Sequence, residues 1–374
     1  MRIGINTRFL LPTKMEGFGW YTYEICKRLA EGHPDHEFVF FFDRPFERKF
    51  VFGPNVQPIV ISPPARHPFL FMYWFEIGIK RALKKHKIDL FFSPDGYLSL
   101  GSDVPQVGVI HDINFEHFPK DLPFSARTYL RYYFPRFARK AAHIITVSNY
   151  SKNDISETYG IDPVKISAIW NGASDVFKPI EDPEKENIRT KYTDGKPYFL
   201  FVGAIHPRKN VKRLIQAFAQ FKERTDNTCQ LLIVGESLWM NFSDDLTLPE
   251  SIKDSIRFTG HLTLDELAKV MGSADIFTYV PYFEGFGIPL VEAMRCGTPI
   301  LAGNKTSLPE VAGDAAVYCD PFDVNDIAAK LELLATNDEL KRSLSEKGRQ
   351  RSREFSWDKA ACEVWEVLVK TFNN

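Results

Sequence analysis

Two glutamates separated by seven residues frame a glycine-rich stretch, EGFGIPLVE, at residues 284–292. Gly285 and Gly287 let the backbone turn tightly after a strand that we expect to end near Val280. Pro289 suits the first turn of a helix, where its missing N–H group is not needed. Because the unpaired N–H groups and the dipole at a helix start attract anions, this segment predicts a phosphate site.

Glu284 precedes the turn and Glu292 lies in the expected helix, so the two carboxylates flank that site from different directions. A carboxylate can accept two charge-assisted hydrogen bonds from the hydroxyl groups of a sugar or ribose. The alternative is structural, with Glu284 on a solvated loop and Glu292 in an ordinary helical turn. For carboxylates at this spacing alone, the structural interpretation is the more common one.

Two adjacent cations follow another expected strand in FLFVGAIHPRKN, at residues 199–210. The strand is followed by Gly203, and Arg208 and Lys209 stand before a helix expected to open near Val211. Arginine offers a planar fork of donors and lysine a compact charge, so the pair suits a diphosphate leaving group. The alternative is a solvated surface pair without a ligand.

Two further candidates lie in the first half of the chain. Gly17 and Gly19, in KMEGFGWYTYE at residues 14–24, lack the third glycine of the dinucleotide-binding pattern G-x-G-x-x-G. They instead predict a loop whose backbone N–H groups approach a phosphate. His111, in VIHDIN at residues 109–114, follows an expected strand and should point into a cleft, although a lone histidine is as readily structural.

Short apolar runs alternate with helical patterns along the chain, which predicts α/β domains with parallel, doubly wound sheets. Such sheets bind ligands beyond the carboxyl ends of their strands, where the candidate residues fall. The expected strands are residues 3–6, 38–42, 90–93, 106–110, 144–147, 198–202, 229–234, 256–259, 276–279 and 299–302.

A polar segment at residues 177–196, which contains Pro179 and Pro183, predicts the link between two domains. We therefore expect one domain over residues 1–180 and a second over residues 181–355. Residues 356–374 are expected to form an amphipathic helix with apolar positions at Ala361, Val364, Trp365, Leu368 and Phe372.

Composition excludes several classes of protein. The 374 residues carry a formal net charge of −1, which argues against general nucleic-acid binding. Residues 1–180 hold 23 Lys and Arg against 18 Asp and Glu, and the remainder holds 24 against 30, so the two halves suit different partners. Five scattered cysteines form no C-x-x-C pair, and no apolar run approaches a membrane span. We expect a cytoplasmic protein, at most peripheral on the inner face of a membrane.

Taken together, the motifs resemble those of the retaining glycosyltransferases of family 4, which have the GT-B fold. Glu284 and Glu292 match the family signature. EGFGWYTYEI looks like its amino-terminal glycine loop, IHDINFEHFP like its histidine loop and VGAIHPRKNVKRLIQAF like its phosphate-binding segment. ITVSNYSKNDISETYGIDPVKISAIWNGASDVFKP is similar to its interdomain approach and SLPEVAGDAAVYCDP to the segment after its last strand. The resemblance covers nearly the whole chain and implies two Rossmann-like domains facing across a cleft, with the C-terminal helix crossing back to the first.

The resemblance also implies roles for the carboxylates and cations. Glu292 would hold the nucleotide ribose, and Glu284 would contact the transferred sugar. Arg208 and Lys209 would balance the diphosphate, and His111 would lie beside the reacting sugar. Many family members have an arginine directly after the glycine that matches Gly203, but this chain has Ala204, and Arg208 is expected to compensate.

The remaining implied donor-binding positions act mainly through their backbones. The backbone N–H groups of the second glutamate segment would bind the sugar hydroxyls, and the glycine loop would close over the diphosphate from the first domain. The loop after the strand at 256–259 would line the base. These positions are Gly17, Gly19, Gly203, Gly235, Leu262, Phe286, Gly287 and Ile288.

The chain contains no D-x-D triplet, so side-chain cations and a helix start would stabilise the departing diphosphate. We therefore expect no metal and no cofactor, and the resemblance implies same-face transfer with retention. Similarity around PRKN favours GDP-mannose as donor, with UDP-sugars next, and a saccharide or lipid-linked saccharide as acceptor. The alternative is a non-catalytic nucleotide-sugar-binding protein of the same fold.

Other enzyme classes fit less well. A glycosidase would not need the phosphate-binding segments. A nicotinamide oxidoreductase needs the missing third glycine, and GNKTS at residues 303–307 lacks the Gly-Lys-Thr/Ser ending of a P-loop.

Contact with an anionic membrane is a separate hypothesis. Residues 67–87 combine many aromatics with five basic residues and one acid, and five more cations follow at Arg127, Arg131, Arg136, Arg139 and Lys140. These residues could rest on anionic lipid. The alternative is a core-packed helix with a solvated basic face.

Overall fold

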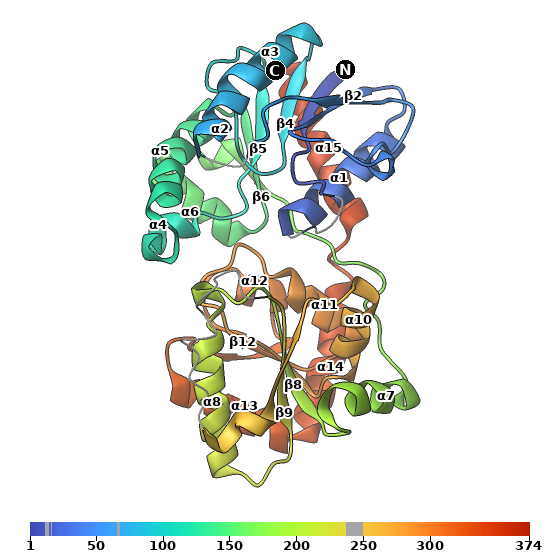
Figure 1. Ribbon diagram of the computed structural model, residues 1–374, viewed down its shortest axis with the longest axis vertical. Coiled ribbons are helices and arrows are strands. Elements are labelled where there is room, and N and C mark those ends of the chain that lie inside the picture. The colour runs from blue at the N-terminus through green and yellow to red at the C-terminus, as the bar shows by residue number, and fades with distance from the viewer. Residues whose placement is uncertain (12–14, 16, 66–67, 237–249) are drawn as a thin grey trace. The chain divides into compact units, whose positions relative to one another are not determined.

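The computed structural model describes residues 1–11, 15, 17–65, 68–236 and 250–374. The chain forms two compact units, Met1–Asn171 with Ser356–Asn374 and Gly172–Phe355. Each unit is a parallel sheet covered by helices (Figure 1). The predicted α/β class with two Rossmann-like domains is therefore confirmed.

The sheet of the first unit has the order β3-β2-β1-β4-β5-β6-β7. The order reverses between β1 and β4, which are hydrogen-bonded neighbours. Its strands are β1 (Arg2–Asn6), β2 (Glu37–Phe42), β3 (Val56–Val60), β4 (Leu90–Ser93), β5 (Gln106–Val109), β6 (His143–Thr146) and β7 (Ile166–Ala168). Its helices are α1 (Gly17–Gly32), α2 (Pro68–Tyr73), α3 (Lys80–Lys85), α4 (Asn114–His117), α5 (Phe124–Lys140), α6 (Asn149–Tyr159) and α15 (Trp357–Asn373), with a π-helical stretch at Trp74–Ile79.

The sheet of the second unit has the order β10-β9-β8-β11-β12-β13 and reverses between β8 and β11. Its strands are β8 (Tyr198–Val202), β9 (Gln230–Val234), β10 (Ile256–Gly260), β11 (Ile276–Tyr279), β12 (Ile300–Gly303) and β13 (Ala316–Cys319). Its helices are α7 (Asp182–Thr193), α8 (Val211–Arg224), α10 (Leu264–Ser273), α11 (Ile288–Cys296), α12 (Leu308–Ala312), α13 (Val324–Thr336) and α14 (Asp338–Ser352).

Each sheet forms the centre of its unit's hydrophobic core and is covered by helices on both faces. The strand EFVFFF of β2 is buried at every position after Glu37, and YFLFV of β8 is buried throughout. Unbroken apolar strands of this kind are stable only where both faces of a parallel sheet are covered. In the part of the chain described, no helix combines the length and apolar composition needed to cross a bilayer.

The second unit begins at Gly172, nine residues before the predicted boundary, and most of the segment predicted as a link is a helix of that unit. Residues 172–180 belong to the second unit, where Asp175 pairs with Arg295 and Ile180 packs beside Gly272. The supposed link contains α7, which begins with Pro183 in its first turn and packs against α10. The segment looks like a linker because α7 is attached largely by polar contacts, including the ion pair of Lys191 with Glu266.

The C-terminal helix α15 lies in the first unit beside α1 (Figure 1). Val364 and Leu368 are fully buried, and the ring of Trp365 stacks on His33 with 3.7 Å between centroids. Arg28 of α1 donates to Asp358 at 2.5 Å. The amphipathic pattern therefore predicts this helix correctly, and its apolar stripe completes the core of the first unit.

We predict that Leu368→Ala destabilises the protein by about 2–5 kcal/mol, because it opens a cavity under α15. Phe372→Ala on the same helix is the matched control, since that ring is 43% exposed, and it should change the stability little. Chemical denaturation of both variants checks this. Equal losses would show that α15 is not anchored through its buried stripe.

Candidate active site

The loops after β8 and β11 meet where the strand order of the second sheet reverses. Asn210, with a left-handed backbone, donates from Nδ2 to the carbonyls of Val280 at 2.9 Å and Pro321 at 2.6 Å. The N–H of Tyr282 donates to the carbonyl of Arg208 at 3.1 Å. These bonds hold the turn Pro207–Lys209 against the loop that leads to α11.

Glu284 lies between the two predicted cations. Its Oε1 is 2.6 Å from a guanidinium nitrogen of Arg208 and 2.5 Å from Nζ of Lys209. Lys209 also donates to the hydroxyl of Tyr279 at 2.7 Å. Glu284 is only 7% exposed, so the solvated-loop alternative for this residue is wrong.

The charges around Glu284 decide its protonation. Burial raises the pKa of its carboxyl group, but Arg208 and Lys209 outweigh this effect and hold the pKa below its ordinary value. Burial, together with the Glu284 charge, raises the pKa of Tyr279 well above its ordinary value. The site at neutral pH therefore contains one carboxylate, two cations and a neutral phenol.

The segment after Glu284 leads into α11 through a glycine that the backbone requires. Gly287 has φ +93°, and an added Cβ would lie 3.0 Å from the side chain of Leu308. The hydroxyl of Ser307 donates to the carbonyls of Glu284 at 2.9 Å and Phe286 at 3.2 Å. Ile288 then opens the helix, so the predicted anion-attracting helix start lies beside the cations.

Glu292 lies in the second turn of α11 and is half-buried. Burial raises the pKa of its carboxyl group to about 7, although Arg295 acts in the opposite direction. Burial therefore dominates at Glu292, whereas the charges of Arg208 and Lys209 dominate at Glu284.

Two glycines predicted to bind the donor, Gly203 and Gly235, directly follow β8 and β9, where their backbones approach each other closely. Gly235 has φ +145°, and an added Cβ would lie 2.0 Å from the carbonyl oxygen of Gly203, so no larger residue fits. The N–H of Gly235 donates to Gly260 at 3.0 Å. Leu262 follows in the loop between β10 and α10 and is half-buried.

The remaining predicted residues lie in the first unit. Gly17 and Gly19 form the first turn of α1, so the prediction that they lie in a loop is wrong. An added Cβ on Gly19 would lie 2.8 Å from the carbonyl oxygen of Phe9, so this glycine is needed for packing. Residues 12–14 and 16 of that predicted loop lie outside the described residues.

His111 follows β5 and Ile110. Its Nε2 donates to the carbonyl of Pro94 at 2.8 Å, and its ring packs edge-on against Phe18 and Tyr21 with 4.8 Å between centroids in each case. Burial lowers its pKa, and the Pro94 carbonyl opposes that effect. The ring is therefore a neutral imidazole with its Nδ1 available as an acceptor.

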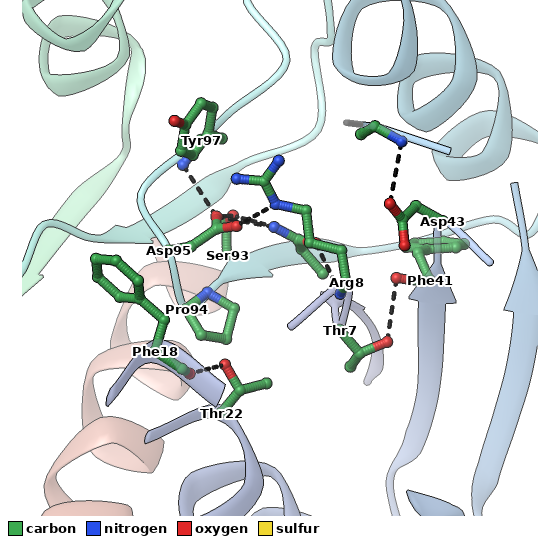
Figure 2. Close-up of polar contacts among 12 residues, drawn as sticks. Thr7, Arg8, Phe18, Thr22, Phe41, Asp43, Ser93, Pro94, Asp95 and Tyr97 are labelled. Atoms are coloured by element: carbon green, nitrogen blue, oxygen red, sulfur yellow. Dashed lines mark hydrogen bonds and ion pairs between the residues drawn. The ribbon is translucent and has the colours of Figure 1, made fainter. Parts of the chain in front are cut away.

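A buried polar network that sequence reasoning missed supports Pro94 (Figure 2). Asp95 is 4% exposed and accepts from Nε of Arg8 at 2.6 Å, from Nδ2 of Asn6 at 2.8 Å and from the hydroxyl of Ser93 at 2.9 Å. The Arg8 guanidinium also lies over aromatic rings, 4.3 Å from the centroid of Tyr97. The available signal was the position of Asn6 and Ser93 at the ends of two strands.

The network explains the orientation of His111. Ser93 and Asp95 are both held by hydrogen bonds, and Pro94 stands between them. The Pro94 carbonyl is therefore fixed in place, and it selects the His111 tautomer with hydrogen on Nε2. Among the described residues, no group of three or more His, Cys, Asp or Glu side chains is arranged to hold a metal ion.

We predict that Asp95→Asn destabilises the protein by about 3–5 kcal/mol, because it leaves the buried Arg8 guanidinium without a countercharge. Asp103→Asn, at an exposed position in the same unit, is the matched control and should have little effect. Thermal or chemical unfolding measures the difference. A loss below 1 kcal/mol for Asp95→Asn would contradict the role of the ion pair.

Two family models match this chain. The model described as "Glycosyl transferases group 1" matches residues 183–351, and "Glycosyltransferase Family 4" matches residues 15–175. Together they cover every strand of the two sheets except β1.

Relatives and solved structures agree with this assignment. The O-antigen chain mannosyltransferase B of Escherichia coli is 27% identical over 365 residues, which are 94% of this chain and 95% of that protein. The O-antigen chain mannosyltransferase RfbU of Salmonella typhimurium is 31% identical over 221 residues, 58% of this chain and 57% of that protein. Anabaena Alr3699/HepE, solved with UDP-glucose, shares the fold with a TM-score of 0.77 at 18% identity, over 99% of this chain and 100% of that one. This chain therefore belongs to the group 1, family 4 glycosyltransferases and is a mannosyltransferase-like member with the GT-B fold.

Proposed function

We propose that the protein transfers a hexosyl group from a nucleoside-diphosphate sugar to a saccharide or lipid-linked saccharide, with retention at the anomeric carbon and without a metal ion. GDP-mannose is the favoured donor, and a UDP-sugar is the next candidate. The observation that carries the proposal is the buried contact of Glu284 with Arg208 and Lys209 beside the start of α11.

The charge balance of this cluster suits a diphosphate. Two cations meet one carboxylate, so the cluster keeps one net positive charge, and the helix start adds a partial positive charge. The side chains of Arg208 and Lys209 are only 25% and 13% exposed, so their effect on a developing negative charge exceeds that in water. Arg208 and Lys209 would then stabilise the diphosphate as it leaves.

The proposed reaction replaces one bond at the anomeric carbon with another. The bond between the anomeric carbon and the diphosphate oxygen breaks, and an acceptor hydroxyl oxygen bonds to that carbon on the same face. The departing phosphate oxygen takes the acceptor proton. Glu284 would hold hydroxyl groups of the sugar through its carboxylate. For the first unit taken by itself, the neutral imidazole of His111 would accept a hydroxyl group at Nδ1.

The relatives support mannose as the transferred sugar. The Escherichia coli and Salmonella typhimurium proteins are both named O-antigen chain mannosyltransferases, which also favours a growing polysaccharide as acceptor. The Anabaena protein was solved with UDP-glucose, which keeps a UDP-sugar as the second donor.

Contact of the first unit with an anionic membrane remains part of the proposal. Trp74 and Phe75 are buried, so core packing accounts for much of the aromatic segment. Met72, Tyr73 and Ile77 are exposed and supply apolar side chains to a bilayer surface.

A thermal-shift panel of GDP, UDP and ADP, followed by turnover of the matching sugar donors, tests the proposed function. The favoured nucleotide should raise the melting temperature, because ligand that binds only the folded state stabilises it. Product analysis should show a retained anomeric configuration. A nucleotide shift without turnover on any saccharide would favour the non-catalytic alternative, and no shift with any nucleotide would reject both.

We predict that Lys209→Met lowers turnover by about 10²–10³-fold, since it removes one cation from the departing diphosphate. Lys212→Met is the matched control, because Lys212 is exposed on the first turn of α8, and its activity should stay within about twofold. Initial rates at saturating donor make the comparison. Equal rates for the two variants would remove Lys209 from the mechanism.

Glu292 should give the protein a pH-dependent stability. Its pKa is about 7 in the folded protein against 4.5 for an ordinary glutamate. The contribution of the protonated side chain to the free energy of unfolding is therefore full below pH 4.5 and is lost as the pH rises through 7. The loss should be at most about 3.5 kcal/mol, since one pKa unit corresponds to about 1.4 kcal/mol. Glu292→Gln should lack this part of the slope.

Denaturation of both proteins from pH 4 to 8 measures that difference directly. Nucleotide affinity should rise through pH 7 only in the unsubstituted protein, because the ionised Glu292 accepts the ribose hydroxyls better. If stability and nucleotide affinity change with pH in the same way in the unsubstituted protein and in Glu292→Gln, this role of Glu292 is contradicted.

A further inference from the structure

A groove of about 720 Å³ lies entirely within the first unit, between α5 and the segments on either side of it. One wall is the stretch from Glu116 to Lys120, which includes the end of α4, and another is the end of α6 at Thr158 and Tyr159. None of the donor-site residues of the second unit belongs to it.

The groove is strongly basic. Four cations line it, Lys120, Arg127, Arg131 and Arg139, against the single carboxylate of Glu116. Arg131 is engaged with that carboxylate at 2.8 Å. For the other three cations, no carboxylate lies within ion-pairing distance among the described residues. An excess of cations in a concave site indicates an anionic ligand.

The three arginines of the groove all come from α5. Arg127 and Arg131 are about one turn apart, and Arg139 follows about two turns later, rotated by about 80° from Arg131, and still lines the groove. Neighbouring turns rise about 6 Å per four residues, so the guanidinium groups form a row along the groove. Guanidinium groups donate in pairs to phosphate oxygens, and this geometry favours phosphate over a single carboxylate.

Exposed aromatic rings line the same groove. Phe124 is 72% exposed, and the Arg127 guanidinium lies 5.1 Å from its ring centroid. Tyr132 is 52% exposed. Large exposed rings beside cations are typical of sites that bind amphipathic or sugar-bearing ligands rather than of an ordinary solvated face.

We propose that this groove binds the phosphate or diphosphate group of the acceptor, next to its saccharide. Only the identity of the ligand as the acceptor rests on the proposed transferase function. The anion site itself is inferred from the residues that line the groove. The chain that forms its first wall follows His111 directly, since α4 begins at Asn114. An acceptor anchored in the groove would therefore lie in the same unit and on the same connection as the proposed sugar-contacting histidine.

The binding test uses the full chain and inorganic pyrophosphate as the probe. Lys209→Met serves as the background, because it weakens anion binding at the donor site. In that background, Arg127→Ala with Arg139→Ala should weaken pyrophosphate binding by at least about tenfold, as expected for two lost charge-assisted contacts. Calorimetric titration at constant ionic strength provides the constants.

Arg136→Ala is the matched control, because Arg136 stands on the same helix and lies outside the groove, 3.6 Å from the ring centroid of Tyr132. It should change pyrophosphate affinity by less than about twofold. Unchanged melting curves show that each variant remains folded. Equal affinities for the groove variant and the control would overturn the proposal.

Kinetics link the groove to the acceptor. A mannosyl alkyl diphosphate and methyl mannoside are compared as acceptors in protein that retains Lys209. There, Arg127→Ala with Arg139→Ala should raise KM for the diphosphate alone, with kcat unchanged. Pyrophosphate binding that persists without turnover on either acceptor would reject the proposed function and leave the anion site standing. The proposal fails if the groove variant loses binding to phosphatidylglycerol vesicles while pyrophosphate affinity is unchanged, because the basic row would then contact a bilayer.

Discussion

A buried carboxylate held between two cations is the constraint on which the site of the second unit depends. Removing Glu284 from water costs several kcal/mol, and attraction to Arg208 and Lys209 offsets that cost only at contact distance. Contact is possible because the cations follow β8 and the carboxylate follows β11, which are neighbouring strands. The ion pairs and the side chain of Asn210 therefore fasten two loops together where the strand order reverses.

The first unit uses the same arrangement with different residues. A cation, Arg8, follows β1, and a carboxylate, Asp95, follows β4 across the reversal of strand order. At such a reversal the connections leave toward opposite faces of the sheet and open a crevice. Polar side chains that enter the crevice lose water, so each needs a partner. A cation from one strand and a carboxylate from the next provide that partner in both units.

The sequence predicts the donor-side loops because their signals are local. Glycines, a proline and charged residues follow clear apolar strands, and the parallel sheet brings Arg208 and Glu284 to one edge. The pairing of Arg8 with Asp95 was missed because 87 residues separate them and neither stands in a recognisable motif. Three strands were missed, and all three stand at the edge of a sheet: β3, which contains Pro58, β7, which has three residues, and β13. Edge strands of this kind are decided by pairing, not by their own composition.

The two proposed anion sites differ in whether a carboxylate is paired with the cations that would bind the ligand. Arg208 and Lys209 are both paired with Glu284. A diphosphate therefore binds there with less favourable free energy than it would beside two cations without a carboxylate. Weaker ground-state binding suits a product that must leave after each cycle. Arg127 and Arg139 have no such carboxylate among the described residues, and the phosphate proposed for them is unchanged by the reaction. Equal binding of that group before and after transfer lowers KM and does not hold back the product nucleotide. A carboxylate that offsets the charge of the cations is therefore needed only at the site of the second unit.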